Sequence, residues 1–304
     1  MTNTMTRTNT WDSIGVDLNT NKLSEALTKS GLDYEVASQP VFTQIGDQKI
    51  KIDGRVCMVR NNDNHVYGIV SDRYVPIQNK DAFDFINYID EDIEFVKAGE
   101  TFTGMIYIIG KLKDMNILGD KFTTYVIFQN SHNGRYQLAT SICPLRIVCQ
   151  NQFNLSFKES NSTFIIRHTK NIESKMAIAA DTLKNISNYM AIFNEKAQLF
   201  AQQKITEHNL TKFINFMFPT NEEMSQRVLN NIEEEKTRFV KAYMSDDNRN
   251  FKGTAWGLLN GVTDYLTHRE YKRKVENLGE KRFMETILVT DRLNDSMQYI
   301  SELV

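Results

Sequence analysis

The chain has 304 residues, of which 41% are hydrophobic and 24% are charged, as in a globular protein with a substantial core. Its 36 basic and 38 acidic residues give a net charge of −2. This balance excludes a protein that is held to nucleic acid or anionic lipid by its overall charge, so a nucleic-acid site must be a local patch.

The cysteines and the apolar stretches indicate the compartment. Cys57, Cys143 and Cys149 are too few for a disulfide framework, and no pair has the C-x-x-C spacing of a zinc or redox site. The Thr/Asn-rich start lacks the apolar stretch of a signal peptide, and no apolar run approaches the about 18 residues of a membrane span. We expect a cytoplasmic protein without membrane contact.

The first half of the chain reads as strands that are separated by turns, after an opening helix. Residues 11–30 predict that helix. Residues 44–52 predict a hairpin that turns at Gly46-Asp47, because such dipeptides favour tight hairpin turns. The segments 55–60 and 66–70 predict a second strand pair.

A helix over 80–89, with Asn79 as its N-cap, precedes a run of strands. Turn residues separate these strands, and Asn133-Gly134 is the strongest of the turn signals. The expected strands cover residues 93–96, 102–112, 122–129 and 136–141. A helix over 145–157 and a closing strand over 163–167 follow, which predicts an antiparallel sheet with a β-β-β-α core.

The second half reads as helical almost throughout. Apolar residues alternate four and three positions apart, which is the heptad seam of a long helix. The seam consists of Ile172, Met176, Ala179, Leu183, Ile186, Met190, Phe193, Ala197 and Phe200. It belongs either to an intramolecular bundle or to a contact with a second copy of the chain, which would make a homo-oligomer. Further helices over 210–218, 222–244, 254–268 and 280–303 make the fold class α+β, with an antiparallel sheet domain over 1–170 and a mostly helical domain over 171–304.

Several motifs occur together in an order that resembles one known family. They are Ser71-Asp-Arg-Tyr-Val-Pro-Ile-Gln-Asn79, His132-Asn-Gly-Arg135, Arg146-Ile-Val-Cys-Gln-Asn151, Ile166-Arg-His-Thr169 and Gly253-Thr-Ala-Trp-Gly-Leu-Leu-Asn260. From Trp11 to about His268 the chain resembles the domain-of-unknown-function 932 family, whose members are often labelled phage/plasmid-like proteins. The resemblance implies a phage, plasmid or other mobile-element context in a bacterial host cell, and it implies no reaction. At the level of fold alone, the β-β-β-α order resembles the core of Rad52-type single-strand annealing proteins.

Residues 135–175 carry a local basic patch, in which basic residues outnumber acidic ones and aromatic side chains interleave. A basic groove with stacking aromatic rings suits single-stranded nucleic acid. We therefore predict single-stranded DNA binding or annealing in replication or recombination, without bond-breaking chemistry, cofactor or metal. The predicted contact residues are Arg73, Arg135, Tyr136, Arg146, Gln150, Asn151, Arg167 and His168. Of these, Arg135, Arg146, Arg167 and His168 would contact phosphates, and Tyr136 would stack on a base.

Each of these residues also has a purely structural interpretation. The aromatic side chains fit core positions. Arg146 follows Pro144 among apolar residues, which also suits an ion pair with an acid of the strand region. Amides such as Gln150 and Asn151 often tie down the backbone at turns and helix ends.

Two other classes of function stay open. The near-neutral charge and the apolar seam suit a non-enzymatic interaction factor, an inhibitor or scaffold that acts on a host or phage partner. Cys149 with His168 or His132 would suit a cysteine nucleophile. Cys149, His132 and His168 together would suit a zinc site if a fourth group or water completed it. No P-loop, G-x-G-x-x-G or H-E-x-x-H motif occurs, so nucleotide hydrolysis and zincin chemistry lack support.

Overall fold

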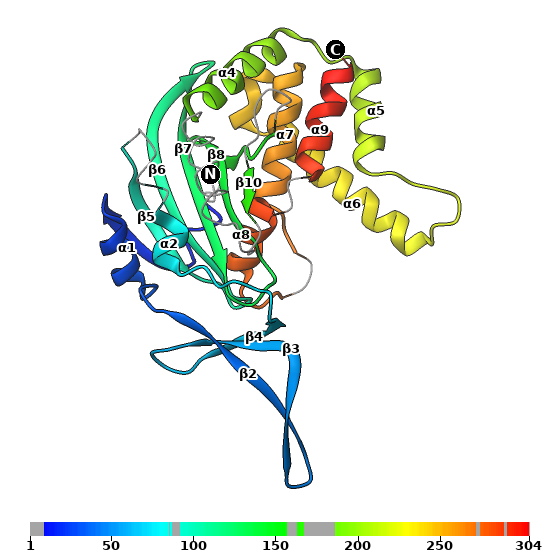
Figure 1. Ribbon diagram of the computed structural model, residues 1–304. Coiled ribbons are helices and arrows are strands. Elements are labelled where there is room, and N and C mark those ends of the chain that lie inside the picture. Colours follow the sequence, from blue (N-terminus) through cyan, green and yellow to red (C-terminus); the bar gives the residue numbers. More distant parts are fainter. Residues whose placement is uncertain are drawn as a thin grey trace.

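The computed structural model describes residues 9–84, 86, 92–156, 163–166, 186–271, 274–288 and 291–303. These residues form an α+β fold with antiparallel sheets in the first half and helices in the second (Figure 1). The strands are β1 (Val16–Thr20), β2 (Val36–Ile45), β3 (Gln48–Arg60), β4 (Val66–Ser71), β5 (Glu94–Glu100), β6 (Met105–Ile117), β7 (Asp120–Ser131), β8 (Leu138–Arg146), β9 (Asn151–Gln152) and β10 (Thr163–Ile166). The helices are α1 (Leu23–Ser30), α2 (Asn79–Asp84), α4 (Ile186–Gln202), α5 (Glu207–Met217), α6 (Gln226–Tyr243), the short 3-10 helix η2 (Asp246–Phe251), α7 (Ala255–Thr267), α8 (Leu278–Leu288) and α9 (Asp291–Leu303).

The main sheet has the strand order β1-β5-β6-β7-β8-β10, and β9 also pairs with β8. All of its pairs are antiparallel. The centre of this sheet is the meander β5 to β8, in which each strand pairs with the next one along the chain. The strands expected over 93–96, 102–112, 122–129 and 136–141 are thereby confirmed, with β5, β6, β7 and β8 all longer than predicted. The closing strand is confirmed over its described residues, 163–166.

The middle of the main sheet is buried on both faces. Successive side chains of a strand point to opposite faces. In β6, Ile106 and Ile108 belong to one apolar core and Tyr107 and Ile109 to another, and all four are buried. Helices α1, α2, α4 and α7 contribute to the first core, whereas α8 and the segment around Trp11 cover the second face. This double burial explains why residues 105–109 at the start of β6 form a continuous apolar run.

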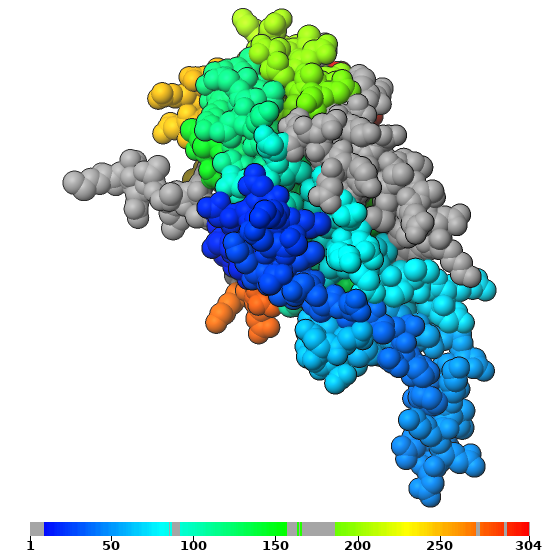
Figure 2. All heavy atoms as spheres, turned by 60° about the vertical axis from the view of Figure 1, so that its left-hand side comes forward, coloured from blue at the N-terminus to red at the C-terminus, as the bar shows by residue number. Residues whose placement is uncertain are grey.

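Strands β2, β3 and β4 form a separate three-stranded antiparallel sheet. Its hairpin turns at Gly46, whose φ of 58° lies in the left-handed region that glycine adopts without strain. The predicted hairpin and the second strand pair are thus confirmed. The outer part of this hairpin extends away from the rest of the molecule (Figures 1 and 2).

Helix α4 carries the second part of the heptad seam. Its seam residues are all buried, namely Ile186, Met190, Phe193, Ala197 and Phe200. The Phe193 ring lies 5.7 Å from that of Phe122 in β7 and 5.9 Å from that of Trp256 in α7. This part of the seam therefore packs within the chain, as the intramolecular interpretation predicted. Residues 172–183 of the seam lie outside the described residues.

Three helix predictions are corrected by the structure. Within the segment 11–30, Val16–Thr20 forms β1 because Val16 pairs with Ala98 at the edge of the main sheet, and only Leu23–Ser30 is helical. The helix predicted over 145–157 is absent from the described part of that segment. There β8 continues to Arg146, and β9 follows a turn. The expected β-β-β-α order is therefore interrupted after its third strand. The segment 280–303 contains two helices, α8 and α9, in place of one.

A helix that crosses a membrane must be both long and apolar. None of the described helices combines the two properties to the extent that a bilayer requires.

Candidate functional site

The predicted contact residues divide between the two ends of β8. Arg135 and Tyr136 precede this strand, whereas Arg146 ends it and Gln150 and Asn151 follow it. At about 3.3 Å per residue, the strand separates the two groups by roughly 25 Å. The described residues of the predicted set therefore do not form one groove.

Arg146 takes part in a buried ion pair. Its side chain is only 3% exposed, and its Nε and Nη2 donate to Oδ2 of Asp120 at 2.8 and 2.5 Å. Its Nη1 donates to Oδ1 of Asn260 at 3.1 Å, and Nη2 also donates to the backbone oxygen of Asp247 at 2.8 Å. The predicted phosphate contact is wrong for Arg146, and the ion-pair interpretation is confirmed. The guanidinium instead joins the main sheet to α7 and η2.

The two amides after β8 serve the backbone and its neighbours. Gln150 has a φ of 56°, and its Nε2 donates to the backbone oxygen of Ile147 at 2.8 Å. Asn151 is buried, with Oδ1 3.2 Å from Nε2 of His268. Because Asn151 is buried and engaged inside the fold, its predicted base or phosphate contact is wrong. Gln150 is half-buried and bonds the backbone locally, and its contact with nucleic acid stays a prediction.

Two aromatic residues of the predicted patch have partners within the fold. Tyr136 is half-buried, and its hydroxyl donates to Oγ1 of Thr103 at 2.8 Å. Phe153 is fully buried and stacks on Trp256, with the ring centroids 5.5 Å apart. The Phe153 ring is therefore not free to stack on a base, whereas the ring of half-buried Tyr136 is only partly covered and its stacking stays a prediction.

Arg73 and Arg135 are the two predicted residues that the structure leaves exposed. Neither forms an ion pair with another described residue. The remaining two, Arg167 and His168, lie outside the described residues.

Arg73 and Arg135 lie where the small sheet meets the main sheet. The hydroxyl of Tyr74 donates to the backbone oxygen of Ser131 at 2.8 Å, which joins the loop after β4 to the end of β7. A Cβ atom at Gly134 would lie 3.1 Å from Cγ1 of Val70 in β4, so the turn before β8 approaches this strand closely. The two arginines thus share one end of the molecule.

The projecting hairpin is the feature that the sequence interpretation did not assign to a site. Residues 42–55, here called the arm, are all exposed. Phe42 pairs with Lys51 and Gln44 with Lys49 across the ladder, so these four side chains share one face. The Lys49 ammonium lies 4.4 Å from the centre of the Phe42 ring. This face therefore combines an aromatic ring with two cations.

The opposite face of the arm is aliphatic. Thr43 pairs with Ile50 and Ile45 with Gln48, which places the two isoleucines on the face away from the lysines. Ile45 is 66% exposed and Ile50 is 43% exposed. The alternation Lys49-Ile50-Lys51-Ile52 was the sequence signal for this division, because residues two apart in a strand share a face.

Five exposed cations lie along the arm and at its base. Arg55 pairs with Ser71, which directly precedes the loop of Arg73. Among the described residues, none of the five has an ion-pair partner, so their charges are available to an external anion. The set, here called the arm cations, consists of Lys49, Lys51, Arg55, Arg73 and Arg135.

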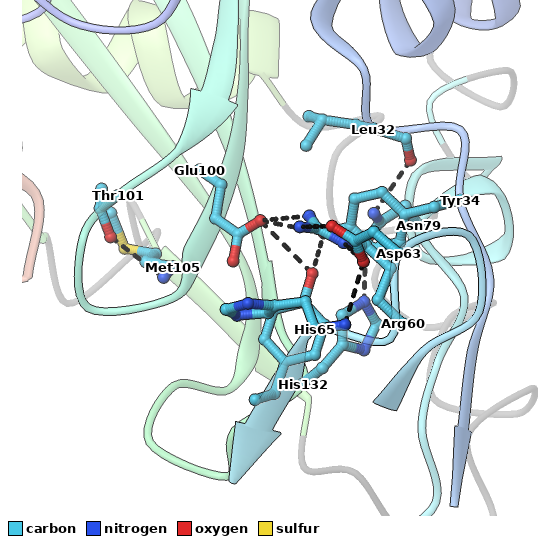
Figure 3. Close-up of polar contacts among 11 residues, drawn as sticks. Leu32, Tyr34, Arg60, Asp63, His65, Asn79, Glu100, Thr101, Met105 and His132 are labelled. Carbon is cyan, nitrogen blue, oxygen red and sulfur yellow. Dashed lines mark hydrogen bonds and ion pairs between the residues drawn. The ribbon is translucent and has the colours of Figure 1, made fainter. Parts of the chain in front are cut away.

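A polar network ties the small sheet to the main sheet (Figure 3). The hydroxyl of Tyr67 in β4 donates to that of Tyr34 at 2.6 Å, and Tyr34 donates to Oε2 of Glu100, at the end of β5, at 3.2 Å. Arg60, at the end of β3, lies 3.5 Å from Glu100 and stacks over the Tyr34 ring at 4.8 Å. We call Tyr34, Arg60, Tyr67 and Glu100 the junction.

Buried groups next to the main sheet support the junction. His132 is fully buried, with its ring 5.3 Å from that of Tyr67 and its Nε2 3.2 Å from Oδ1 of Asn79. Asn79 also accepts from Nδ2 of Asn130 at 3.1 Å and donates to the backbone oxygen of Leu32 at 3.0 Å. Asn79 is the first residue of α2, and its side chain bonds these groups and anchors the base of the small sheet, so the prediction that it caps the helix is wrong.

Burial sets the ionisation of the junction. It raises the pKa of Glu100 above its ordinary value, and the hydroxyl of Tyr34 and the charge of Arg60 oppose this shift in part. Burial and then the charge of Glu100 raise the pKa of Tyr34 to about 12, and burial also raises the pKa of Tyr67. Neither phenol is a nucleophile near neutral pH, so the junction is suited to holding the arm in place.

Cys149 is not arranged as a nucleophile with His132. Burial raises the pKa of the Cys149 thiol to about 11, which disfavours the reactive thiolate. His132 lies before β8 and Cys149 after it, so the strand separates the two side chains. Within the described ranges, no three His, Cys, Asp or Glu side chains gather as a metal site would require.

Comparison with known proteins places most of this architecture in one family. No curated protein and no solved structure matches the chain. The family model described as Domain of unknown function (DUF932) matches residues 66–286, from β4 to α8. The match covers Arg73, Arg135 and the main sheet from β5 onward, and it begins after β3. The chain therefore belongs to the Domain of unknown function (DUF932) family.

Proposed function

We propose that the chain binds single-stranded DNA through the arm and its base, as a phage or mobile-element protein of replication or recombination. The observation that carries this proposal is the face of the arm on which Phe42 lies beside Lys49 and Lys51. Single-strand binding needs an aromatic ring for a base to stack on and cations along the path of the backbone.

The other arm cations extend this face toward the main sheet. Arg55, Arg73 and Arg135 are exposed at the base of the arm and have no ion-pair partner among the described residues. A strand that stacks on Phe42 would meet cations both at the ring and farther along its backbone. This path replaces the groove predicted around Arg146.

The junction supports the proposal mechanically. A two-stranded ribbon that projects into solvent is poorly stabilised on its own. Tyr34 and Arg60 hold the ends of β2 and β3 against Glu100 of the main sheet, so the base of the arm keeps a fixed orientation. Pre-ordered contacts lose less entropy on binding.

The test measures the fluorescence anisotropy of a labelled oligothymidine of about 30 nucleotides. The wild type should bind, and log Kd should rise with log salt between about 50 and 200 mM, because phosphate contacts release counterions. K49Q/K51Q should weaken binding and lower the salt slope by about 0.7 for each phosphate that the chain no longer neutralises. F42A should weaken binding by roughly 1–3 kcal/mol with little change in the slope.

A control variant removes the same number of positive charges from a surface away from the arm. K212A/R227A neutralises two exposed cations on α5 and α6 and should bind like the wild type. Absence of binding at low salt, or equal losses of affinity in both double variants, would refute the proposal.

A second candidate is an interaction factor that docks through the aliphatic face of the arm. Exposed Ile45 and Ile50 favour this alternative, since apolar side chains gathered on a surface often mark a protein contact. I45S/I50S leaves the cationic face intact. If this variant loses a co-purifying protein while the wild type retains no nucleic acid, the interaction factor is the better description.

A further inference from the structure

A cavity of about 180 Å³ lies among α7, α8, α9 and β9, away from the arm. Its floor is buried and polar, formed by Gln152, Thr263 and Thr267. Leu293 supplies an apolar wall, and exposed Arg269 stands at the rim. A concave site with apolar walls and a few converging polar groups is typical of a small-molecule pocket.

The floor contains a polar atom without a partner. Gln152 is 1% exposed, and its Nε2 donates to Oγ1 of Thr10 at 2.8 Å. Its Oε1 has no hydrogen-bond partner among the described residues. Exchanging the two amide atoms would only move the unmatched position to the nitrogen. Because buried polar atoms are normally paired, binding of a group that donates a hydrogen bond to Oε1 of Gln152 would be favoured.

The charges around the cavity favour an anion. Arg269 has no ion-pair partner among the described residues. Arg292 uses Nη2 to donate to the backbone oxygen of Met217 at 2.9 Å, which leaves other N–H groups of its guanidinium. Glu285 accepts from the hydroxyl of Tyr271 and lies 3.9 Å from the Lys281 ammonium, so its charge is already partly balanced.

The size of the cavity limits the ligand. A cavity of about 150 Å³ holds benzene, so this one accommodates about one ring with a substituent. We propose that the cavity binds a small organic anion of this size. Its carboxylate or phosphate pairs with Arg269, and its N–H or O–H group donates to Gln152. This inference does not rest on the function proposed for the arm.

Three probe molecules test separately whether the ligand needs an anionic group for Arg269 and a hydrogen-bond donor for Gln152. Orotate has a ring, N–H donors and a carboxylate, whereas uracil lacks the carboxylate and benzoate lacks the donors. Isothermal titration calorimetry on the full chain should rank orotate as the tightest binder. If uracil bound as tightly as orotate, the requirement for an anionic group would be wrong. If benzoate bound as tightly as orotate, the proposed hydrogen bond to Gln152 would be wrong.

Variants of the chain locate the binding. R269A changes an exposed side chain, so it should fold normally and bind orotate about tenfold more weakly, while R227A serves as the matched arginine control. Q152L should erase the preference of the wild type for orotate over benzoate. Wild type that fails to bind orotate, or R269A that binds it as well as R227A does, would overturn the site. K49Q/K51Q should leave orotate affinity unchanged, so failure of this site and failure of the arm are distinguishable.

Discussion

The hydroxyl of Tyr34 donates to Oε2 of Glu100 at 3.2 Å, and this bond is one of those that cross the boundary between the two sheets. Tyr34 lies just before the small sheet, whereas Glu100 ends β5 of the main sheet. The hydroxyl of Tyr67 lies within hydrogen-bond distance of both oxygens, the Tyr34 hydroxyl and Oε2 of Glu100. The attachment of the arm thus depends on a few hydrogen bonds that mutation can remove one at a time.

Tyr34→Phe should destabilise the chain by roughly 1–3 kcal/mol, because Glu100 loses a donor and Tyr67 loses the closer of its two acceptors. Tyr67→Phe should cost less, roughly 0.5–1.5 kcal/mol, since the bond from Tyr34 to Glu100 remains. Urea unfolding measures both changes. Tyr299→Phe, which keeps the ring stacked on Phe216, is the control, and a Tyr34→Phe variant as stable as this control would contradict the prediction.

The stability of the junction should depend on pH in a defined direction. Burial raises the pKa of Glu100 above its ordinary value of 4.5, so the folded chain holds this proton more tightly than the unfolded chain does. The contribution of this carboxyl to stability is therefore fully present below about pH 4.5 and is lost as pH rises through the raised pKa.

Glu100→Gln removes this titration. The stability of the wild type relative to this variant should fall as pH rises from acid to neutral, measured as the difference in urea midpoints. Glu222→Gln, at an exposed position, is the control. A difference that increases with pH would show that Glu100 ionises more readily in the folded chain.

Asp120→Ala should destabilise the chain by roughly 3–5 kcal/mol, because it leaves the Arg146 guanidinium buried without its carboxylate. Glu233→Ala, which breaks the surface pair with Lys236, should change stability by roughly 0–1 kcal/mol. Denaturant unfolding of the two variants compares them directly. Similar losses of stability in both would mean that the Arg146 pair is no more important than a surface ion pair.

The thiols should differ in reactivity. Burial raises the pKa of Cys143 to about 12 and that of Cys149 to about 11, whereas Cys57 is half-buried. Native protein treated with iodoacetamide near neutral pH should be labelled first at Cys57, as peptide mass spectrometry can measure. Labelling of Cys149 at a rate equal to that of Cys57 would restore the case for a cysteine nucleophile.

The sequence predicted correctly those turns and strands that depend on residues close together along the chain. The turn at Gly46-Asp47 follows from the freedom of glycine to adopt a positive φ, and the strands β6 and β7 follow from pairing with a neighbour along the chain. The apolar run around Leu145 suits a helix and a buried strand equally well, and pairing with Thr123 in β7 determines the outcome.

The candidate site was harder to predict, because the availability of a charge depends on distant partners. The apolar neighbours of Arg146 suit an ion pair, but nothing in the neighbouring sequence identifies Asp120 as the residue that neutralises it. The alternation Lys49-Ile50-Lys51-Ile52 is visible in the sequence, but only the structure shows that both faces of that hairpin are exposed. Arg73 and Arg135 are exposed, and no described acid forms an ion pair with them, so they stay available for the contacts predicted from the sequence.

The double burial of β6 has a consequence for where this protein can meet other molecules. Across the described strands, the broad surfaces at the middle of the main sheet are already occupied by the chain's own helices and by the segment around Trp11. External molecules are therefore excluded from the middle of this sheet, and both of the sites proposed above lie at its periphery. Substitutions at either of these proposed sites are expected to leave the packing of the interior intact.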